Sequence, residues 1–265
     1  MEYKISTGDE TAADELPELH ATCSGLKAFA TVEAHAGIEE CRKACGGQGF
    51  LRSSGIADLT CSFAEPVTVE GEQVILSLQV GRFLIKSVRQ MKANNPLKGS
   101  VEYLLQEPLP AMPQGSDAWM RDTPTLVALL RDRARRFALK LEARFDAAEK
   151  GGKTFDEATN ANAILAYKTA GCHSSFVVAR NNLRAVDEYI TDDQTKAVLD
   201  RLLRLNILMR LHEEVRALCT GEAILSIVLY QLVYNIHCTV RLNRKLPMYS
   251  LKTWIFFTIL LRPDI

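Results

Sequence analysis

The chain has 265 residues and a mass of 29.5 kDa, with 47% hydrophobic and 24% charged residues. This composition is typical of a globular protein with one large or two modest cores, and it excludes disordered and fibrous classes. Thirty-two Lys and Arg residues balance 32 Asp and Glu residues, so no global positive field would attract nucleic acid or an anionic membrane. We therefore expect the function to reside in local sites.

Seven scattered cysteines contain no Cys-x-x-Cys pair, which argues against a disulfide framework. The first twenty residues are acidic and lack an apolar run, so nothing in them resembles a secretory signal. Together these features predict a protein of a reducing interior compartment.

The spacing of apolar residues, mostly three or four, predicts a nearly all-α fold. Over residues 17–45 one apolar stripe continues until Gly46-Gly47, where a glycine marks the expected helix C-terminus. Residues 46–69 are expected to form an irregular loop. From about 70 to 90 a second helix is apolar nearly all the way round and should be buried between neighbours.

A proline-dense stretch at 94–123 is the best candidate for a linker between two helical domains, 1–93 and 124–222. In the second domain helices are expected near 124–149, 156–190 and 192–219. Residues 223–265 form an apolar and basic tail, whose uncharged runs are shorter than the roughly 18 residues needed to span a bilayer. A buried helix or a poorly packed tail is therefore favoured over membrane insertion.

The first candidate site is the glycine-rich segment Ala44-Cys-Gly-Gly-Gln-Gly-Phe50. Three glycines within four positions would let the backbone come close to a ligand, although they also suit a simple helix cap and turn. A dinucleotide-binding fingerprint is excluded, because its glycines open a helix after a strand and these close a helix.

The second candidate is the acidic segment that precedes the apolar helix, Thr68-Val-Glu-Gly-Glu-Gln-Val74. Glu70 and Glu72 fall at the expected helix start, where the macrodipole favours carboxylates. An acidic helix start is commonplace in itself. Gly71 beside Glu70 and the apolar helix ahead of it suggest a carboxylate at the edge of a dry cavity, ionised near neutral pH yet poorly hydrated, as a general base requires.

Other reactive residues are better interpreted as structural, and no metal site is predicted. Cys41 and Cys45 lie one helical turn apart, but no histidine stands at ligand spacing, so packing is favoured. Adjacent helical residues such as Cys172 and His173 point in different directions, which argues against a thiol–base pair. The charged run 131–144 is interpreted as a helix face and not as a nucleic-acid patch.

Six motifs, in order and in spacing, closely resemble the acyl-CoA oxidase family. They are Leu16-Pro-Glu-Leu-His-Ala21, Gly25-Leu-Lys-Ala-Phe29, Gly37-Ile-Glu-Glu-Cys-Arg42, Ala44-Cys-Gly-Gly-Gln-Gly-Phe50, Glu70-Gly-Glu-Gln73 and Leu78-Gln-x-x-Arg-Phe-Leu84. The resemblance is dense from about 14 to 92 and looser to about 222. It implies a four-helix-bundle-like first domain, and the second helical domain favours the oxidases over the related acyl-CoA dehydrogenases.

The resemblance implies a flavin enzyme of fatty acid β-oxidation that converts fatty acyl-CoA to trans-2-enoyl-CoA, with FAD as cofactor, O2 as electron acceptor and H2O2 as product. Glu70 stands at the position of the catalytic base that removes the pro-R α-proton. The loop that approaches the FAD diphosphate across a homodimer interface corresponds to Cys45, Gly46, Gly47 and Gln48. Glu72 and Gln73 lie next to cofactor contacts.

The chain departs from the family pattern at Gln48, Phe50 and Gln73, where members usually carry His, Tyr and Asn. Members also have an N-terminal helical domain and a β-domain ahead of the segment matched here, so this chain is expected to be a C-terminal fragment. The family implies a peroxisomal location, although Arg262-Pro-Asp-Ile265 is not a Ser-Lys-Leu-type signal. A non-catalytic helical dimerisation module and a true dehydrogenase stay open as alternatives.

Overall fold

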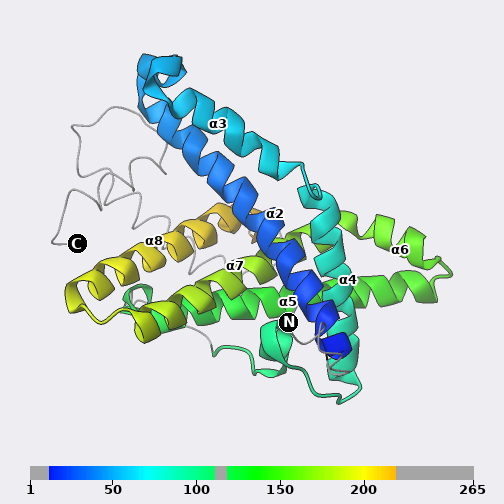
Figure 1. The fold of residues 1–265 in the computed structure, drawn as a ribbon. Helices are drawn as coiled ribbons and strands as arrows, with labels where there is room; N and C mark the ends of the chain where they lie inside the picture. The colour runs from blue at the N-terminus through cyan, green and yellow to red at the C-terminus, as the bar shows by residue number, and fades with distance from the viewer. Residues whose placement is uncertain (1–11, 111–117, 219–265) are drawn as a thin grey trace. The chain divides into compact units, whose positions relative to one another are not determined.

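Every regular element that the computed structural model describes, over residues 12–110 and 118–218, is a helix (Figure 1). The expected all-α class is therefore confirmed, and the predicted tail 223–265 lies outside the described residues. None of the described helices is both long and apolar enough to cross a membrane. The described residues divide into two compact units, with 12–38, 58–109 and 129–178 in one and 39–57, 110, 118–128 and 179–218 in the other.

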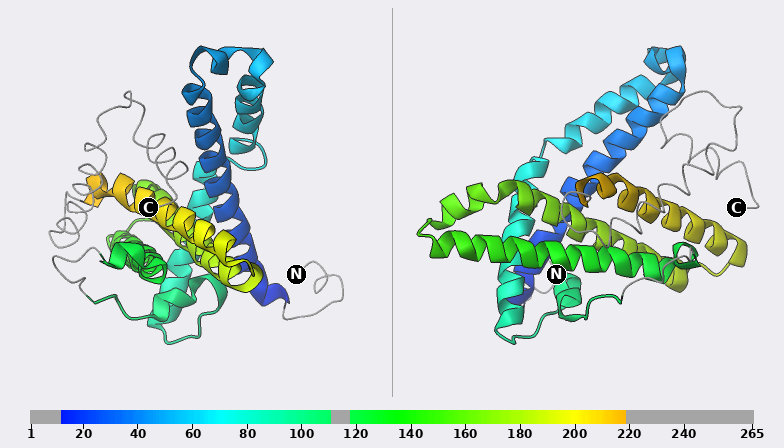
Figure 2. Two further views of the ribbon diagram at one scale, coloured as in Figure 1. Left: turned by 90° about the vertical axis from the view of Figure 1, so that its left-hand side faces the viewer. Right: turned by 180° about the vertical axis from the view of Figure 1, so that it is seen from behind.

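Five long helices carry most of the described chain, and two further views show the same elements (Figure 2). They are α2 (Ala12–Ala44), α4 (Gln73–Lys92), α5 (Thr123–Lys150), α7 (Ala163–Tyr189) and α8 (Asp193–Leu218). The shorter elements are α3 (Ile56–Ala64), α6 (Phe155–Ala161) and the 3₁₀ helices η1 (Gly46–Phe50), η2 (Arg52–Ser54), η3 (Glu65–Val67), η4 (Gly99–Leu105) and η5 (Ala118–Arg121). The helices expected at 17–45, 124–149 and 192–219 are confirmed.

Two sequence-based expectations about the helices are wrong. The segment expected to be an irregular loop, 46–69, contains α3 and three 3₁₀ helices, because Ile56–Ala64 holds no glycine or proline to interrupt a helix. The helix expected over 156–190 is two helices that meet at Asn162. The first of them starts at a capping box, in which the Thr154 hydroxyl accepts the Glu157 amide and Glu157 bonds back to Thr154.

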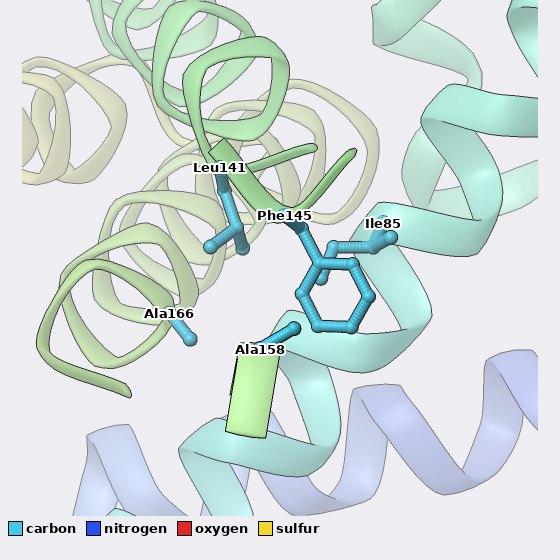
Figure 3. Close-up of a cluster of buried hydrophobic side chains, with 5 residues drawn as sticks. All are labelled: Ile85, Leu141, Phe145, Ala158 and Ala166. Carbon is cyan, nitrogen blue, oxygen red and sulfur yellow. The ribbon is translucent and has the colours of Figure 1, made fainter. Parts of the chain in front are cut away.

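The core of the first unit joins α4, α5, α6 and α7. Figure 3 shows side chains from all four helices converging on Phe145, which is 1% exposed. Ile85, Leu141, Ala158 and Ala166 complete this cluster. Burying a side chain such as Phe145 contributes about 1.5–3 kcal/mol, so this cluster is a main source of stability for the helices around it.

Small residues let the helices of the first unit approach closely. A side-chain carbon added at Gly81 on α4 would lie 2.9 Å from the Cβ of Ala166 on α7. One added at Gly25 on α2 would lie 2.9 Å from the Ser174 hydroxyl on α7 and 3.3 Å from Val80 on α4. Because interiors pack at crystal-like density, a larger side chain at Gly81 must push α4 away from α7, and one at Gly25 must displace the Ser174 hydroxyl and crowd Val80.

The expected linker 94–123 does not run free of the core. Within it η4 buries Val101, Tyr103 and Leu104, which pack in the first unit. The Tyr103 hydroxyl shares a hydrogen bond of 3.1 Å with Nδ1 of buried His173 on α7, so His173 helps to hold η4 against α7. At the start of η4 the Glu18 carboxylate on α2 accepts the Ser100 amide.

The charged run 131–144 is not a fully solvated face, because two of its carboxylates are buried. Glu142 on α5 is 3% exposed and pairs with Lys92 and Arg89 of α4. Asp132 is also buried and pairs with Arg136 at 2.6 Å. A buried charge is tolerated only when it is paired, so these contacts explain how α5 combines a charged sequence with a buried side.

In the second unit α8 packs beside η5. Leu203, Ile207 and Leu211 recur at helical spacing along α8 and are buried, as are Trp119 of η5 and Leu126 of α5. Polar contacts fix the register of these elements. The Thr123 hydroxyl donates a hydrogen bond to Asp200, and the Arg204 guanidinium donates to the Arg121 carbonyl at 3.1 Å.

Candidate functional site

Glu70 lies in the turn ahead of α4 and not on the helix itself. The helix expected from residue 70 starts at Gln73, with Glu72 as its N-cap. Glu70 adopts a φ of 55° and Gly71 a φ of 110°, so the turn uses left-handed backbone at two consecutive residues. A non-glycine residue rarely adopts this conformation, and when it does the surroundings hold it there. The backbone is therefore strained at Glu70, the candidate base.

Three contacts hold this turn from different directions. The Glu72 carboxylate accepts the backbone amides of Val74 at 2.9 Å and Ile75 at 3.3 Å, which caps α4. The Gln73 amide donates to the Tyr167 hydroxyl on α7 at 3.3 Å. The Lys27 ammonium on α2 donates to the Gly71 carbonyl oxygen. Glu72 and Gln73, predicted from the sequence as neighbours of a cofactor, therefore have structural partners of their own.

The carboxylate of Glu70 is exposed among the described residues. The sequence predicted a poorly hydrated carboxylate beside a buried helix, and within this chain that prediction is wrong. The reason is that α4 is buried only from Ser77 onward, whereas its first turn leaves Val74 and Ile75 40% and 57% exposed. Two exposed apolar side chains on the same turn form a surface that another group could cover.

The glycine-rich loop follows α2 and belongs to the second unit. Its residues Cys45, Gly46, Gly47 and Gln48 are all exposed. Cys45 is the N-cap of η1, and its amide bonds to the carbonyls of Cys41 and Arg42 at 3.2 Å each. Phe50, at the end of η1, is 80% exposed. The loop therefore presents both backbone and an aromatic ring to its surroundings.

The fold of the chain requires glycine at two of the three glycine positions of this loop and not at the third. Gly46 has a φ of 58°, which favours glycine. At Gly49, which is buried, an added side-chain carbon would lie 2.0 Å from the Arg42 carbonyl oxygen. At Gly47 the φ is not positive and an added carbon would meet nothing within 4 Å. The fold described here thus explains the glycine at 46 and at 49, but not at 47.

The structure places the predicted site residues in two groups. Glu70, Glu72 and Gln73 share one turn of the first unit, and the glycine loop lies in the second. Sequence reasoning missed Lys27 and Tyr167. Their contacts join positions 44 and 94 residues apart, and no local pattern reports such pairs.

Two family models match the chain: the acyl-CoA oxidase C-alpha1 domain over residues 1–85 and acyl-CoA oxidase over residues 122–239. Rat peroxisomal acyl-coenzyme A oxidase 1 is 34% identical over 218 residues, which are 78% of this chain and 31% of the relative. The peroxisomal acyl-coenzyme A oxidase 1 of Arabidopsis thaliana is 32% identical over 206 residues, which are 75% of this chain and 30% of the relative. This chain therefore spans about a third of the length of these relatives.

Solved acyl-CoA oxidases share the fold. Oxidase 3 of Yarrowia lipolytica matches with a TM-score of 0.76 and 26% identity, over 88% of this chain and 34% of that one. Oxidase 2 of Caenorhabditis elegans, whose structure holds FAD, an ascaroside-CoA and ATP, matches with a TM-score of 0.72 and 27% identity, over 83% of this chain and 32% of that one. Sequence, family models and fold agree, and the chain belongs to the acyl-CoA oxidase family.

Proposed function

We propose that this chain supplies the catalytic base and part of the FAD-binding surface of an acyl-CoA oxidase. The reaction is the oxidation of fatty acyl-CoA to trans-2-enoyl-CoA, with O2 as the acceptor and H2O2 as the product. The observation that supports this proposal is the left-handed backbone at Glu70, the residue to which the family resemblance assigns the base. Relatives of the family, among them a Caenorhabditis elegans oxidase bound to FAD and an acyl-CoA derivative, support the substrate and cofactor classes.

In this proposal Glu70 accepts the α-proton of the thioester. An α-proton beside a thioester carbonyl is only weakly acidic, so a carboxylate fully solvated by water removes it inefficiently. The bound acyl-CoA and the remaining two thirds of a family member would cover Glu70 and the apolar side chains of Val74 and Ile75, which excludes water from the carboxylate. A bound FAD would supply the oxidising power, as the acceptor of a hydride from the β-carbon.

The glycine loop fits a role in holding FAD. Gly47 needs no left-handed backbone and faces no atom of its own chain within 4 Å, so a close approach by a group from outside would explain its missing side chain. Cys45, Gly46 and Gln48 flank it on the same exposed turn. In the proposal, backbone groups of this loop contact the FAD diphosphate region, and Glu72 and Gln73 act indirectly by fixing the start of α4.

We also propose a homodimer, a peroxisomal location and a place in fatty acid β-oxidation. The dimer is supported by the consecutive exposed side chains of Phe50 and Leu51 beside the loop, because neighbouring exposed apolar side chains are typical of an interface. The location is supported by relatives that are named peroxisomal. The division at 94–123 is likewise a proposal, supported by the two family models, which end at 85 and begin at 122.

A hybrid oxidase tests this function. Residues 14–222 of this chain would replace the matching segment of the rat oxidase, and peroxide release would be measured with palmitoyl-CoA per bound flavin. Glu70→Gln should lower turnover by about 10²–10⁴-fold, the usual contribution of a general base. Glu65→Gln, an exposed glutamate five residues upstream, is the matched control and should leave turnover unchanged.

Two outcomes contradict the proposal. Undiminished turnover in Glu70→Gln would exclude Glu70 as the base. A hybrid that stays a colourless dimer, without flavin, would favour the alternative of a non-catalytic helical dimerisation module. The exposure of Glu70 in this chain would then agree with that alternative. Acyl-CoA-dependent flavin reduction without peroxide would instead identify a dehydrogenase.

A further inference from the structure

We propose that Lys27 is a positioning residue for the base. Its ammonium, on α2, holds the Gly71 carbonyl and thereby fixes the turn that carries Glu70. The inference rests on the proposed function, because it assigns Lys27 a role only if Glu70 is the base. It adds a residue of α2 to the turn that precedes α4, where Tyr167 of α7 already holds Gln73.

Glu70 has a φ of 55°, a left-handed conformation that an L-residue leaves readily unless neighbours oppose it. Gly71 beside it has a φ of 110°, which glycine adopts without a side-chain penalty. A rotation of the Gly71–Glu72 peptide would redirect the chain on both sides of it. The Gly71 carbonyl belongs to that peptide, so a donor on this oxygen restrains ψ of Gly71 and φ of Glu72, directly after Glu70 in the turn.

Lys27 is half-buried on α2, a helix whose neighbouring positions Ser24, Gly25 and Ala28 are buried in the first unit. A hydrogen bond from a charged group is roughly twice as strong as one between neutral groups. The ammonium therefore ties the turn to a well-packed helix, which the capping carboxylate of Glu72 cannot do because it belongs to the same segment.

Lys27 acts on the position of Glu70 and not on the stability of the whole protein. The core of the first unit is built elsewhere, around Phe145 and Ile85, so the loss of one hydrogen bond at a half-exposed turn leaves that core intact. What changes is the freedom of Glu70. A misplacement of about 1 Å at a reacting group can lower a rate by 10²-fold, even where the protein remains folded.

The contact itself can be measured on the 265-residue chain by NMR. With carbonyl-¹³C glycine and ¹⁵N glutamate, only the two Gly–Glu peptides, 71–72 and 221–222, give a doubly labelled signal, and Glu222→Gln identifies the second. Lys27→Met should shift the Gly71 carbonyl resonance, and Lys27→Arg should restore it in part. Lys150→Met, an exposed lysine paired with Asp146, is the control and should leave the resonance unmoved.

The kinetic arm uses the flavin-loaded hybrid oxidase. Lys27→Met should lower kcat about 10- to 100-fold with KM changed less than about twofold, and the isotope effect with α-dideuterated palmitoyl-CoA should rise, because proton removal becomes slower than the other steps. Lys27→Arg should recover part of the loss. A merely structural role would lower the flavin-loaded fraction without raising the isotope effect per flavin.

Each other outcome overturns the inference in a recognisable way. An unmoved Gly71 resonance in Lys27→Met would show that Lys27 does not hold the turn. A moved resonance with wild-type kcat and isotope effect would show that the turn does not position the base. Full turnover in Glu70→Gln would show that Glu70 is not the base, and Lys27 would then have no base to position. The Gly71 carbonyl resonance would still show whether Lys27 binds that carbonyl.

Discussion

Alanine at Gly47 and alanine at Gly49 should have opposite consequences, although the two positions are two residues apart. At Gly49 the added carbon would lie 2.0 Å from the Arg42 carbonyl oxygen, well inside the 3.4–4 Å of ordinary contact. The oxygen is backbone and cannot rotate away. We expect a cost of about 1–3 kcal/mol in the free energy of unfolding, as for other overpacked sites.

At Gly47 the added carbon meets nothing of the chain and the backbone is not left-handed. Gly47→Ala should therefore leave the fold intact, or stabilise it by about 0.4–1 kcal/mol, because alanine lowers the entropy of the unfolded chain. If the loop contacts FAD, the same variant should weaken flavin binding at least tenfold, or about 1.4 kcal/mol.

The assay pairs two measurements. Urea unfolding of the 265-residue chain, followed by circular dichroism, compares Gly47→Ala and Gly49→Ala with the wild type, and a flavin titration of the hybrid oxidase compares the affinities. Wild-type flavin affinity in Gly47→Ala would refute the close approach on which the cofactor assignment of this loop depends. Wild-type stability in Gly49→Ala would refute the packing of the loop against α2.

Three further predictions follow from the core and the caps. Phe145→Ala should cost about 3–5 kcal/mol, and the control Phe155→Ala, at a ring that is 48% exposed, should cost clearly less in the same urea titration; equal costs would contradict the described core. Gly81→Val should cost about 1–3 kcal/mol by forcing α4 from α7, and a neutral effect would show that the close approach is absent. The backbone amide of Thr154, followed by its hydroxyl, holds the pKa of Glu157 below its usual value, so the ionised carboxylate contributes stability above its unfolded pKa that is lost as the pH falls through the lowered pKa. Thermal melts between pH 6 and pH 3 should therefore lose part of their acid sensitivity in Glu157→Gln, and an identical pH profile would contradict this.

The helices were predictable where their signals are local. The apolar stripe from Leu19 to Ala34, with the stop at Gly46, predicts α2, whose C-terminus the structure places at Ala44. The predicted start of α4 was wrong because Glu70 and Glu72 are equally good candidates for the N-terminus of a helix in the sequence. Only Glu72 accepts amides of the first turn, and that choice depends on the left-handed backbone at Glu70.

The packing environment was harder to predict than the helices. The proline-dense stretch looked like a linker, but Tyr103 within it finds a buried partner in His173, 70 residues away. The charged run on α5 looked solvated, but Glu142 is buried against cations of α4. In each case a long-range partner changes the environment of the residue, and a single sequence carries no record of that partner.

Removal of the substrate's α-proton by Glu70 is the claim on which the rest depends, and solvent exchange reports it without reliance on peroxide. The hybrid oxidase would be incubated with palmitoyl-CoA in D2O under anaerobic conditions, and deuterium at the α-carbon of recovered substrate would be measured by mass spectrometry. We predict exchange in the wild type and in Glu65→Gln, and its loss in Glu70→Gln. Exchange at the wild-type rate in Glu70→Gln would contradict the assignment of this carboxylate as the base.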